Sequence, residues 1–326
     1  MQESPQRNSL SSVISEGLAR GATVLAPNER AAGDLRARFD RSQSAAGLNA
    51  WEPAQIRSWN AWLESLWSTL VNQGAELRLL LNPSQEHMLW REIIAASPAA
   101  PSLGSPDSVA ELAQTAWRLA ASYEATADLR RFAATHDSKT FATWAAAFAN
   151  RCARSQFLST AELPAAIREH VADASVTAPA QLLLIGFDDD TPARTPLLTT
   201  LEAGGCTIDH LAISTEAVLH TIVRATNPQE ELRTAAHWIR RFIETSPEPP
   251  RIALIVPNLG AERPTLEATL RNILAPELQS IDADLSSTPY SFSTGTPLAE
   301  TPMVATALEF IRWLGGPLPL DRVSTL

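Results

Sequence analysis

The chain has 326 residues, of which 45% are hydrophobic and 19% charged, as in an ordinary globular protein large enough for two or three packed units. Its net charge of −10, from 36 acidic and 26 basic residues, argues against a protein that coats nucleic acid through its overall charge. No apolar run approaches the roughly 18 residues that a membrane span needs, and the start MQESPQRNSLSS lacks the layout of a secretory signal. We therefore expect a cytoplasmic protein whose residues 1–20 form a disordered tail.

The residue pattern gives little support to metal or nucleophile chemistry. Cys152 and Cys206 lie far apart and neither belongs to a Cys-x-x-Cys pair, so we expect two buried free thiols. The six histidines show no ligand spacing, and no Gly-x-Ser-x-Gly nucleophile motif is present. The sequence thus predicts no metal site and no catalytic residue in this chain.

The first half of the chain begins with a strand and continues with helices. The short apolar run Thr23–Ala26 predicts a strand, which the turn at Pro27 and Asn28 ends before a helix over 30–39. Apolar residues at three- and four-residue spacing then predict helices over 51–71, 83–94, 109–123, 141–154 and 161–171, with the tryptophans in the core. Residues 51–175 are therefore expected to form an all-helical insertion.

Strands return in the second half. The continuous apolar run Gln181–Ile185 is typical of a strand that is buried on both faces of a parallel sheet. The further pattern predicts strands over 206–213 and 251–256, a short strand within 289–298, and helices over 195–203, 228–245, 264–273 and 303–314. Strands that alternate with helices on both sides of a helical insertion favour an α/β fold built from parallel units.

The segment VLAPNERAAGDLRARF, residues 24–39, combines a strand end, a turn and a basic helix. Amide groups at a helix N-terminus and nearby guanidinium groups suit a phosphate backbone. The candidate DNA-binding residues are Asn28, Arg30, Arg36 and Arg38. The alternative is an ordinary solvated helix face that carries a few arginines.

A second segment, LLLIGFDDDTPARTPLL, follows the strand at 181–185 with Gly186, Phe187 and three aspartates, Asp188, Asp189 and Asp190. Carboxylates in a turn before a helix usually cap that helix, so we favour turn formation over a metal site. No Gly-x-x-x-x-Gly-Lys-Ser/Thr motif is present to cradle a nucleotide phosphate, because the only Lys-Thr pair, at Lys139, has no glycine before it. Asp137 and Lys139 match half of a nuclease motif, but a helix cap at Asp137 or Ser138 is the favoured interpretation.

These segments, together with RIALIVPNLGAERPTLEATLRN at 251–272, resemble in their order the motifs of UvrD-like superfamily 1 helicases. The set resembles most the AddB and RexB family of probable DNA-repair proteins. The resemblance implies that 24–39 corresponds to the motif that touches single-stranded DNA. It also implies that Gly186 and Phe187 replace the Asp-Glu pair that serves Mg²⁺ and the attacking water, and that Pro257 and Asn258 stand where an arginine reaches the γ-phosphate.

The resemblance further implies a degenerate P-loop-NTPase-like (RecA-like) fold. Its first domain would comprise 21–50 and 176–215, with 51–175 as the insertion and 216–326 as the start of a second, truncated domain. The implied protein is a non-catalytic helicase-like scaffold in double-strand-break repair, which contacts single-stranded or broken-end DNA and an AddA-like helicase-nuclease. A PD-(D/E)XK nuclease with its Mg²⁺ would lie beyond residue 326, and no cofactor is expected in this segment.

Two other functions remain open from the sequence. An active helicase or NTPase would need an unusual phosphate site, and ATP with Mg²⁺ would then stabilise the protein. A helical adaptor that binds only protein would fail to bind single-stranded DNA even at low salt.

Overall fold

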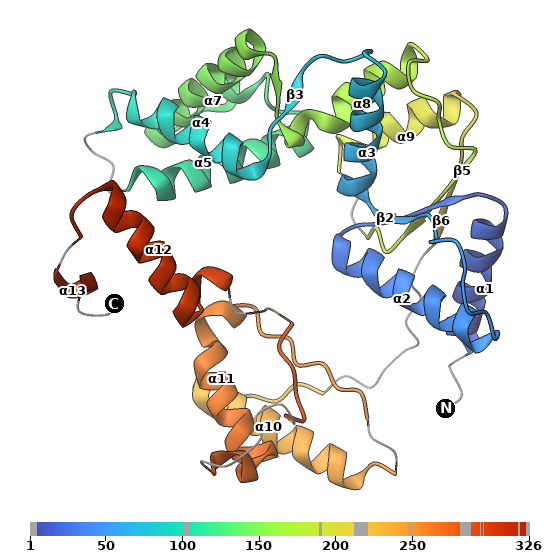
Figure 1. The fold of residues 1–326 in the computed structure, drawn as a ribbon, viewed down its shortest axis with the longest axis vertical. Helices are drawn as coiled ribbons and strands as arrows, with labels where there is room; N and C mark the ends of the chain where they lie inside the picture. The colour runs from blue at the N-terminus through green and yellow to red at the C-terminus, as the bar shows by residue number, and fades with distance from the viewer. Residues whose placement is uncertain are drawn as a thin grey trace. The chain divides into compact units, whose positions relative to one another are not determined.

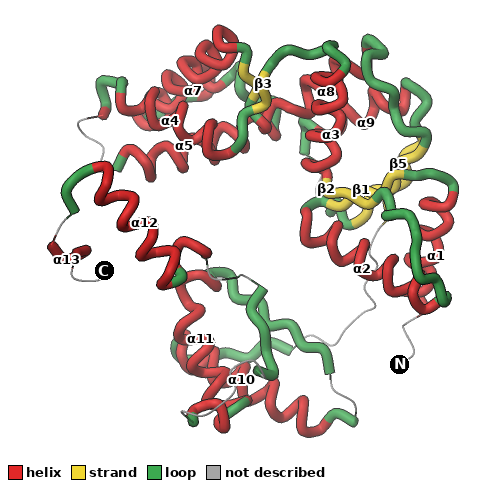
Figure 2. The backbone as a smooth tube through the Cα atoms, viewed as in Figure 1, coloured by secondary structure: helices red, strands yellow, loops and turns green. Residues whose placement is uncertain are grey.

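The computed structural model describes residues 5–100, 105–188, 191–211, 221–247, 250–280, 288–293, 295, 297–318 and 320–323. The chain divides into two compact units, Met1–Ala217 and Val218–Leu326. The structure confirms the α/β class: it is mostly helical, with parallel sheets of four and two strands (Figures 1 and 2). No helix in the described ranges is long and apolar enough to cross a membrane.

The first unit is organised by a four-stranded parallel sheet with the strand order β2-β1-β5-β6. Its strands are β1 (Thr23–Ala26), β2 (Ile56–Ser58), β5 (Gln181–Ile185) and β6 (Thr207–Leu211). The strands predicted at β1, β5 and β6 are thus confirmed. The central pair is in register at Val24 with Leu183 and at Leu25 with Leu184.

Helices cover both faces of this sheet. Alternate strand residues Val24 and Leu183 face α1 (Pro5–Ala19) and α2 (Glu29–Ala45). Leu25 and Leu184 lie on the opposite face, in a core built with residues of α3 (Trp59–Asn72), α8 (Leu163–Ala172) and α9 (Arg194–Ala203). The connection β1–α2–β2 moves toward one edge of the sheet over one face, and the connection β5–α9–β6 moves toward the other edge over the other face. The two crossovers therefore have the same hand, as in doubly wound sheets.

The expectation of a disordered tail over 1–20 is wrong for most of that segment, because residues Pro5–Ala19 form α1. Ile14 and Leu18 are four residues apart and therefore share one helix face, which packs against the sheet. Gly17 lets the helix approach closely, since a Cβ atom there would lie 2.4 Å from Cδ1 of Leu183. Tertiary packing of this short apolar stripe thus orders a segment that is polar in composition.

Residues 83–155 form a helical block with its own core. The block comprises α4 (Pro83–Ala95), α5 (Pro106–Ser122), the short α6 (Leu129–Phe132) and α7 (His136–Ser155). Trp90 is fully buried at its centre, where its ring stacks on Phe148 with centroids 4.3 Å apart and lies 6.0 Å from Trp117. The tryptophans that were expected in the core from the helix over 51–71 are confirmed there: Trp59, Trp62 and Trp67 are all buried.

The expectation that 51–175 is all-helical is wrong in three places. The helix expected from residue 51 begins only at Trp59, because Ile56–Ser58 alternates between buried and exposed positions and pairs with β1. Ser58 ends that strand and caps α3 through its side chain. Two further strands, β3 (Leu79–Leu80) and β4 (Phe157–Leu158), pair in parallel and are followed by the 3₁₀ turn η2 (Thr160–Glu162).

The second unit is helical in the part that the structure describes. Its elements are α10 (Pro228–Thr245), α11 (Leu259–Leu274), η3 (Pro276–Gln279), η5 (Leu298–Glu300), α12 (Pro302–Gly315) and α13 (Leu320–Val323). Leu232 and Ala236 of α10 pack against Leu266 and Leu270 of α11. The helices predicted over 228–245 and 303–314 are confirmed, and α11 begins five residues earlier than predicted.

The strand expected over 251–256 does not form, nor does a strand at Leu298, which begins a 3₁₀ turn. A strand requires a hydrogen-bonded neighbour, and the described residues of this unit supply none for the 251–256 segment. Ile255 is accordingly 88% exposed despite its apolar side chain. The pattern of apolar residues was correct, but it could not reveal whether a pairing partner is present.

Candidate functional site

The carboxyl edge of the four-stranded sheet is the candidate site of the first unit. Parallel strands end at one edge, and ligands of doubly wound sheets bind there at the point where the strand order reverses. In this sheet that point lies between β1 and β5, which lead to β2 and β6 on opposite sides. Pro27 and Asn28 follow β1 and Gly186 follows β5, so the sheet brings together both of the segments that the sequence singled out.

Asn28 begins α2. Its backbone is extended (φ −148°), and its Oδ1 accepts a hydrogen bond of 2.9 Å from the backbone N–H of Ala31. This is the usual role of an asparagine at a helix start, and it leaves the rest of the exposed first turn open to solvent. Arg30 is exposed on the same turn.

The other two predicted DNA-binding arginines are engaged with acids of their own helix. Arg36 forms an ion pair with Glu29, and Arg38 lies 2.8 Å from Oδ2 of Asp34. The hydrogen bond from Arg36, followed by one from Ser58, lowers the pKa of Glu29. The helix therefore offers guanidinium groups whose charge is partly compensated, and a phosphate would have to compete with these carboxylates.

The end of β5 carries an aromatic and cationic cluster. Gly186 has a left-handed backbone (φ 74°), and it turns the chain so that Phe187 lies edge-on to Trp59, with ring centroids 6.3 Å apart. The guanidinium of Arg194 lies 4.6 Å from the Phe187 centroid and 5.9 Å from the Trp59 centroid. Arg194 is only 8% exposed, so this cation is held against the two rings in the interior.

The residues at this edge do not fit a magnesium–nucleotide complex. Neither Gly186 nor Phe187 has an oxygen that could bind a metal ion through its side chain, and a buried guanidinium beside them would repel a cation. Asp188 is exposed, whereas Asp189 and Asp190 lie outside the described residues. The described ranges contain no group of three or more His, Cys, Asp or Glu side chains that could hold a metal ion.

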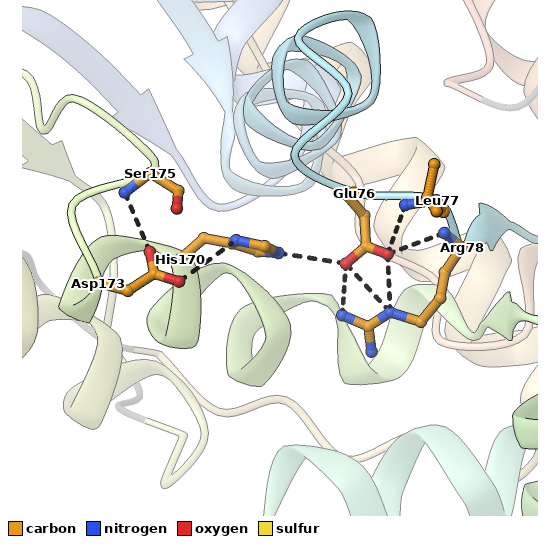
Figure 3. Close-up of polar contacts among 6 residues, drawn as sticks. All are labelled: Glu76, Leu77, Arg78, His170, Asp173 and Ser175. Carbon is orange, nitrogen blue, oxygen red and sulfur yellow. Dashed lines mark hydrogen bonds and ion pairs between the residues drawn. The ribbon is translucent and has the colours of Figure 1, made fainter.

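A polar network that sequence reasoning missed lies between the loop after α3 and helix α8 (Figure 3). The carboxylate of Glu76 accepts hydrogen bonds from the backbone N–H groups of Leu77 and Arg78, both at 2.8 Å, and from the Arg78 guanidinium at 2.6 Å. Oε2 of Glu76 also lies 3.1 Å from Nε2 of His170. The hydrogen bond from Arg78 is the main reason that the pKa of Glu76 falls to about 2.

This network connects the loop after α3 with α8 and packs against Trp67. The Arg78 guanidinium also lies 5.2 Å from the ring of Trp67, and the His170 ring lies edge-on to the same indole. The other histidine nitrogen, Nδ1, is 4.0 Å from Oδ2 of Asp173. Because the two halves of the network are separated by more than 90 residues, no local spacing in the sequence could have predicted it.

The remaining motif residues have structural roles. The helix cap predicted at Asp137 or Ser138 is wrong in position, because α7 begins at His136 and its cap is Thr135. Ser138 lies inside the helix, where its side chain accepts a hydrogen bond from the Thr135 N–H in a capping box. Lys139 is exposed on the first turn of α7. Both cysteines are buried and free, as predicted. Burial, followed by nearby carboxylates, raises the pKa of Cys152 to about 12, so this thiol is unreactive at neutral pH.

Pro257 and Asn258 lie in the second unit, at the turn before α11. The backbone oxygen of Asn258 accepts hydrogen bonds from the N–H groups of Ala261 and Glu262 at 3.1 Å, so this residue starts the helix. Its side chain makes no capping hydrogen bond.

The comparisons with known proteins give no assignment. No protein-family model matches the chain, and a search of curated proteins also found no match.

Proposed function

We propose that this chain is a helicase-like scaffold that does not hydrolyse nucleotides and that serves in DNA double-strand-break repair. In this proposal the sheet unit is a degenerate RecA-like domain of the AddB type, which contacts single-stranded DNA and an AddA-like helicase-nuclease partner. The observation that carries the proposal is the position of Phe187, which lies against Trp59 and Arg194 at the carboxyl end of β5.

The sheet of the first unit supports the proposal through its topology. A doubly wound parallel sheet with its reversal point between β1 and β5 is the architecture in which a phosphate-binding loop and an acid pair would act. In this proposal the chain keeps that architecture, and a buried cation and two aromatic rings occupy the place that the acid pair would have. An arrangement of this kind stabilises the fold and opposes Mg²⁺, which favours a unit retained for its shape.

In this proposal, helix α2 provides the contact with DNA. The start of α2 places Asn28 and Arg30 at the carboxyl edge of the sheet, and Arg36 and Arg38 follow two turns further along the same helix. The ion pairs of Arg36 and Arg38 are exposed, and pairs of that kind contribute little to stability. A phosphate can therefore replace Glu29 or Asp34 as the partner of these guanidinium groups at small cost, and such binding should weaken as salt is added.

The test uses the full chain and two measurements. We expect ATP with Mg²⁺ to leave the melting temperature unchanged, and we expect a fluorescein-labelled oligothymidylate to bind with an affinity that falls with salt. A rise of the melting temperature with ATP and Mg²⁺ would contradict the proposal and support an active NTPase. Absence of oligonucleotide binding at low salt would instead support a protein-binding adaptor.

A further inference from the structure

Helix α10 exposes a stacked aromatic pair. The rings of Trp238 and Phe242 have centroids 5.3 Å apart and an interplanar angle of 5°, and the two residues are 58% and 42% exposed. A different face of the helix buries Leu232, Ala236 and Ile239. The aromatic pair is therefore directed away from the core of this unit, although burial of two large rings would be more favourable for folding.

An arginine whose guanidinium group has no partner among the described residues lies beside these rings. Arg241 follows Trp238 by three residues and thus shares its side of the helix. Within the part of the chain that the structure describes, the Arg241 guanidinium takes part in no ion pair or hydrogen bond. The neighbouring Arg240 differs, because it lies 2.8 Å from Oε1 of Glu244 and donates to the backbone oxygen of Ile273.

A polar hollow lies along the first half of α10. It has a volume of about 450 Å³, and one of its lining residues, Thr234, lies one turn before Trp238. Its lining residues are Asn227, Gln229, Glu230, Arg233, Thr234 and His237. Amide, hydroxyl, guanidinium and imidazole groups, together with the carboxylate of Glu230, thus line a hollow in the turns that precede the aromatic pair.

We propose that this face of α10 binds single-stranded nucleic acid. Bases would stack on Trp238 and Phe242, while the phosphates would meet Arg241 and, along the hollow, Arg233. Flat rings accept any base, and nearby guanidinium groups bind phosphate, so this combination is typical of sequence-tolerant single-strand binding. The presence of Arg241 beside the rings and of a polar hollow in the preceding turns favours this ligand over an apolar protein surface.

The charges on α10 determine how strongly the affinity for nucleic acid should depend on salt. α10 carries three arginines and three glutamates, so long-range attraction of a polyanion is weak. Stacking should therefore provide most of the affinity, and the salt dependence should be smaller than at a site that binds mainly through phosphates. This site goes beyond the proposed function, since it rests on residues of the second unit alone.

The first experiment compares two aromatic pairs of the full chain. In one variant Trp238→Ala is combined with Phe242→Ala. The matched control combines Phe310→Ala with Trp313→Ala on α12, a pair that is similarly stacked and 51% and 49% exposed, but whose neighbour Arg312 is paired with Glu309. We expect the α10 variant to bind oligothymidylate roughly tenfold or more weakly, and the control to bind as the unchanged protein does.

Further readouts separate stacking from a general loss of structure. The single change Trp238→Phe keeps an aromatic ring, so this protein should bind oligothymidylate almost as tightly as the unchanged protein does. An abasic oligonucleotide has no bases to stack, so the unchanged protein should bind it as weakly as the α10 variant binds oligothymidylate. Photocrosslinking with 5-iodouracil should attach DNA to α10. Equal losses from both aromatic pairs, no loss from the α10 pair, or crosslinks confined to other helices would each overturn the inference.

Failure of the α10 site and failure of the proposed function would give different results. If Arg36→Ala and Arg38→Ala weaken binding while the α10 variant does not, the inference is wrong and the proposed function stands. If ATP with Mg²⁺ stabilises the protein while the α10 variant still loses affinity, the proposed function is wrong and the α10 site stands.

Discussion

Nε2 of His170 lies 3.1 Å from Oε2 of Glu76, although the two residues are 94 positions apart in the sequence. This contact ties α8 to the loop that follows α3, so it connects the segment that leads into the helical block with the segment that returns to the sheet. Glu76 is 8% exposed, and its carboxylate accepts more hydrogen bonds than any neutral side chain could at that position. The stability of this junction should therefore depend on the charge of Glu76.

The first prediction concerns acid. The pKa of Glu76 is about 2 in the folded protein against an ordinary value of 4.5, so the unfolded chain takes up the proton first as the pH falls. The contribution of this carboxylate to stability should be complete above about pH 4.5 and should be lost progressively toward pH 2. Urea unfolding over this range, compared between the unchanged protein and Glu76→Gln, isolates the effect from that of other acids.

We expect Glu76→Gln to lower the free energy of unfolding by about 2 kcal/mol at neutral pH, because hydrogen bonds to a charged acceptor are lost. The difference between the two proteins should shrink as the pH approaches 2. Glu29→Gln is the matched control, since the pKa of Glu29 is also lowered but its carboxylate lies on the surface, and it should change stability little. A difference between Glu76→Gln and the unchanged protein that is constant across the pH range would contradict this account.

The second prediction concerns the cluster at the end of β5. Arg194→Met keeps an aliphatic stem but removes the cation, and Phe187→Leu keeps an apolar side chain but removes the ring. A double-mutant cycle of these two changes should give a coupling energy of about 1 kcal/mol, as expected for a partly desolvated cation over a ring. A coupling energy near zero would mean that Arg194 is held by other contacts and that the ring pair is not its main partner.

The third prediction separates the capping role of Asn28 from DNA contact. Asn28→Ala should destabilise the protein by about 1 kcal/mol, because the side-chain bond to Ala31 is lost, whereas Asn28→Asp should preserve stability. If the first turn of α2 contacts phosphate, Asn28→Asp should nevertheless weaken oligothymidylate binding at low salt, because it adds a negative charge there. Unchanged DNA affinity in the Asn28→Asp protein would place the DNA contact elsewhere.

The success of prediction from sequence followed the strength of the local pattern. α10 was predicted to the residue, because Asn227 caps it, Pro228 opens it and its apolar stripe is regular. β5 was predicted because the four consecutive apolar residues Leu182–Ile185 suit a strand buried on both faces. β3 and β4 were missed, since strands of two residues have no period to detect.

In the candidate site, too, features with a clear local pattern could be predicted and tertiary contacts could not. Gly186 and Phe187 could be placed at a strand end from the sequence, because the strand itself was clear. The stacking of Arg194 on Phe187 could not be predicted, since it depends on where Trp59 lies after an unpredicted strand has brought α3 to the sheet. The contact between Glu76 and His170 could not be predicted from the sequence either, because only the fold brings these residues together.

The fourth prediction tests the helix that replaced the expected disordered tail. Gly17→Ala places a Cβ atom 2.4 Å from Cδ1 of the buried Leu183, so it should lower the free energy of unfolding by about 1–2 kcal/mol through overpacking. Gly33→Ala is the matched control, because it lies inside α2 with no heavy atom within 4 Å of the added Cβ. This second change should raise the free energy of unfolding by about 0.5–1 kcal/mol, since alanine favours a helix interior over glycine.

The two substitutions are chemically identical, so their opposite signs depend on the packing of α1 alone. If residues 5–19 were disordered in solution, Gly17→Ala would leave stability unchanged, because Leu183 would have no helix against it. Denaturant melts of the two variants beside the unchanged protein would separate these cases. Amide hydrogen exchange gives an independent check: the N–H groups around Ile14 should be protected in the unchanged protein and should lose protection in the Gly17→Ala variant.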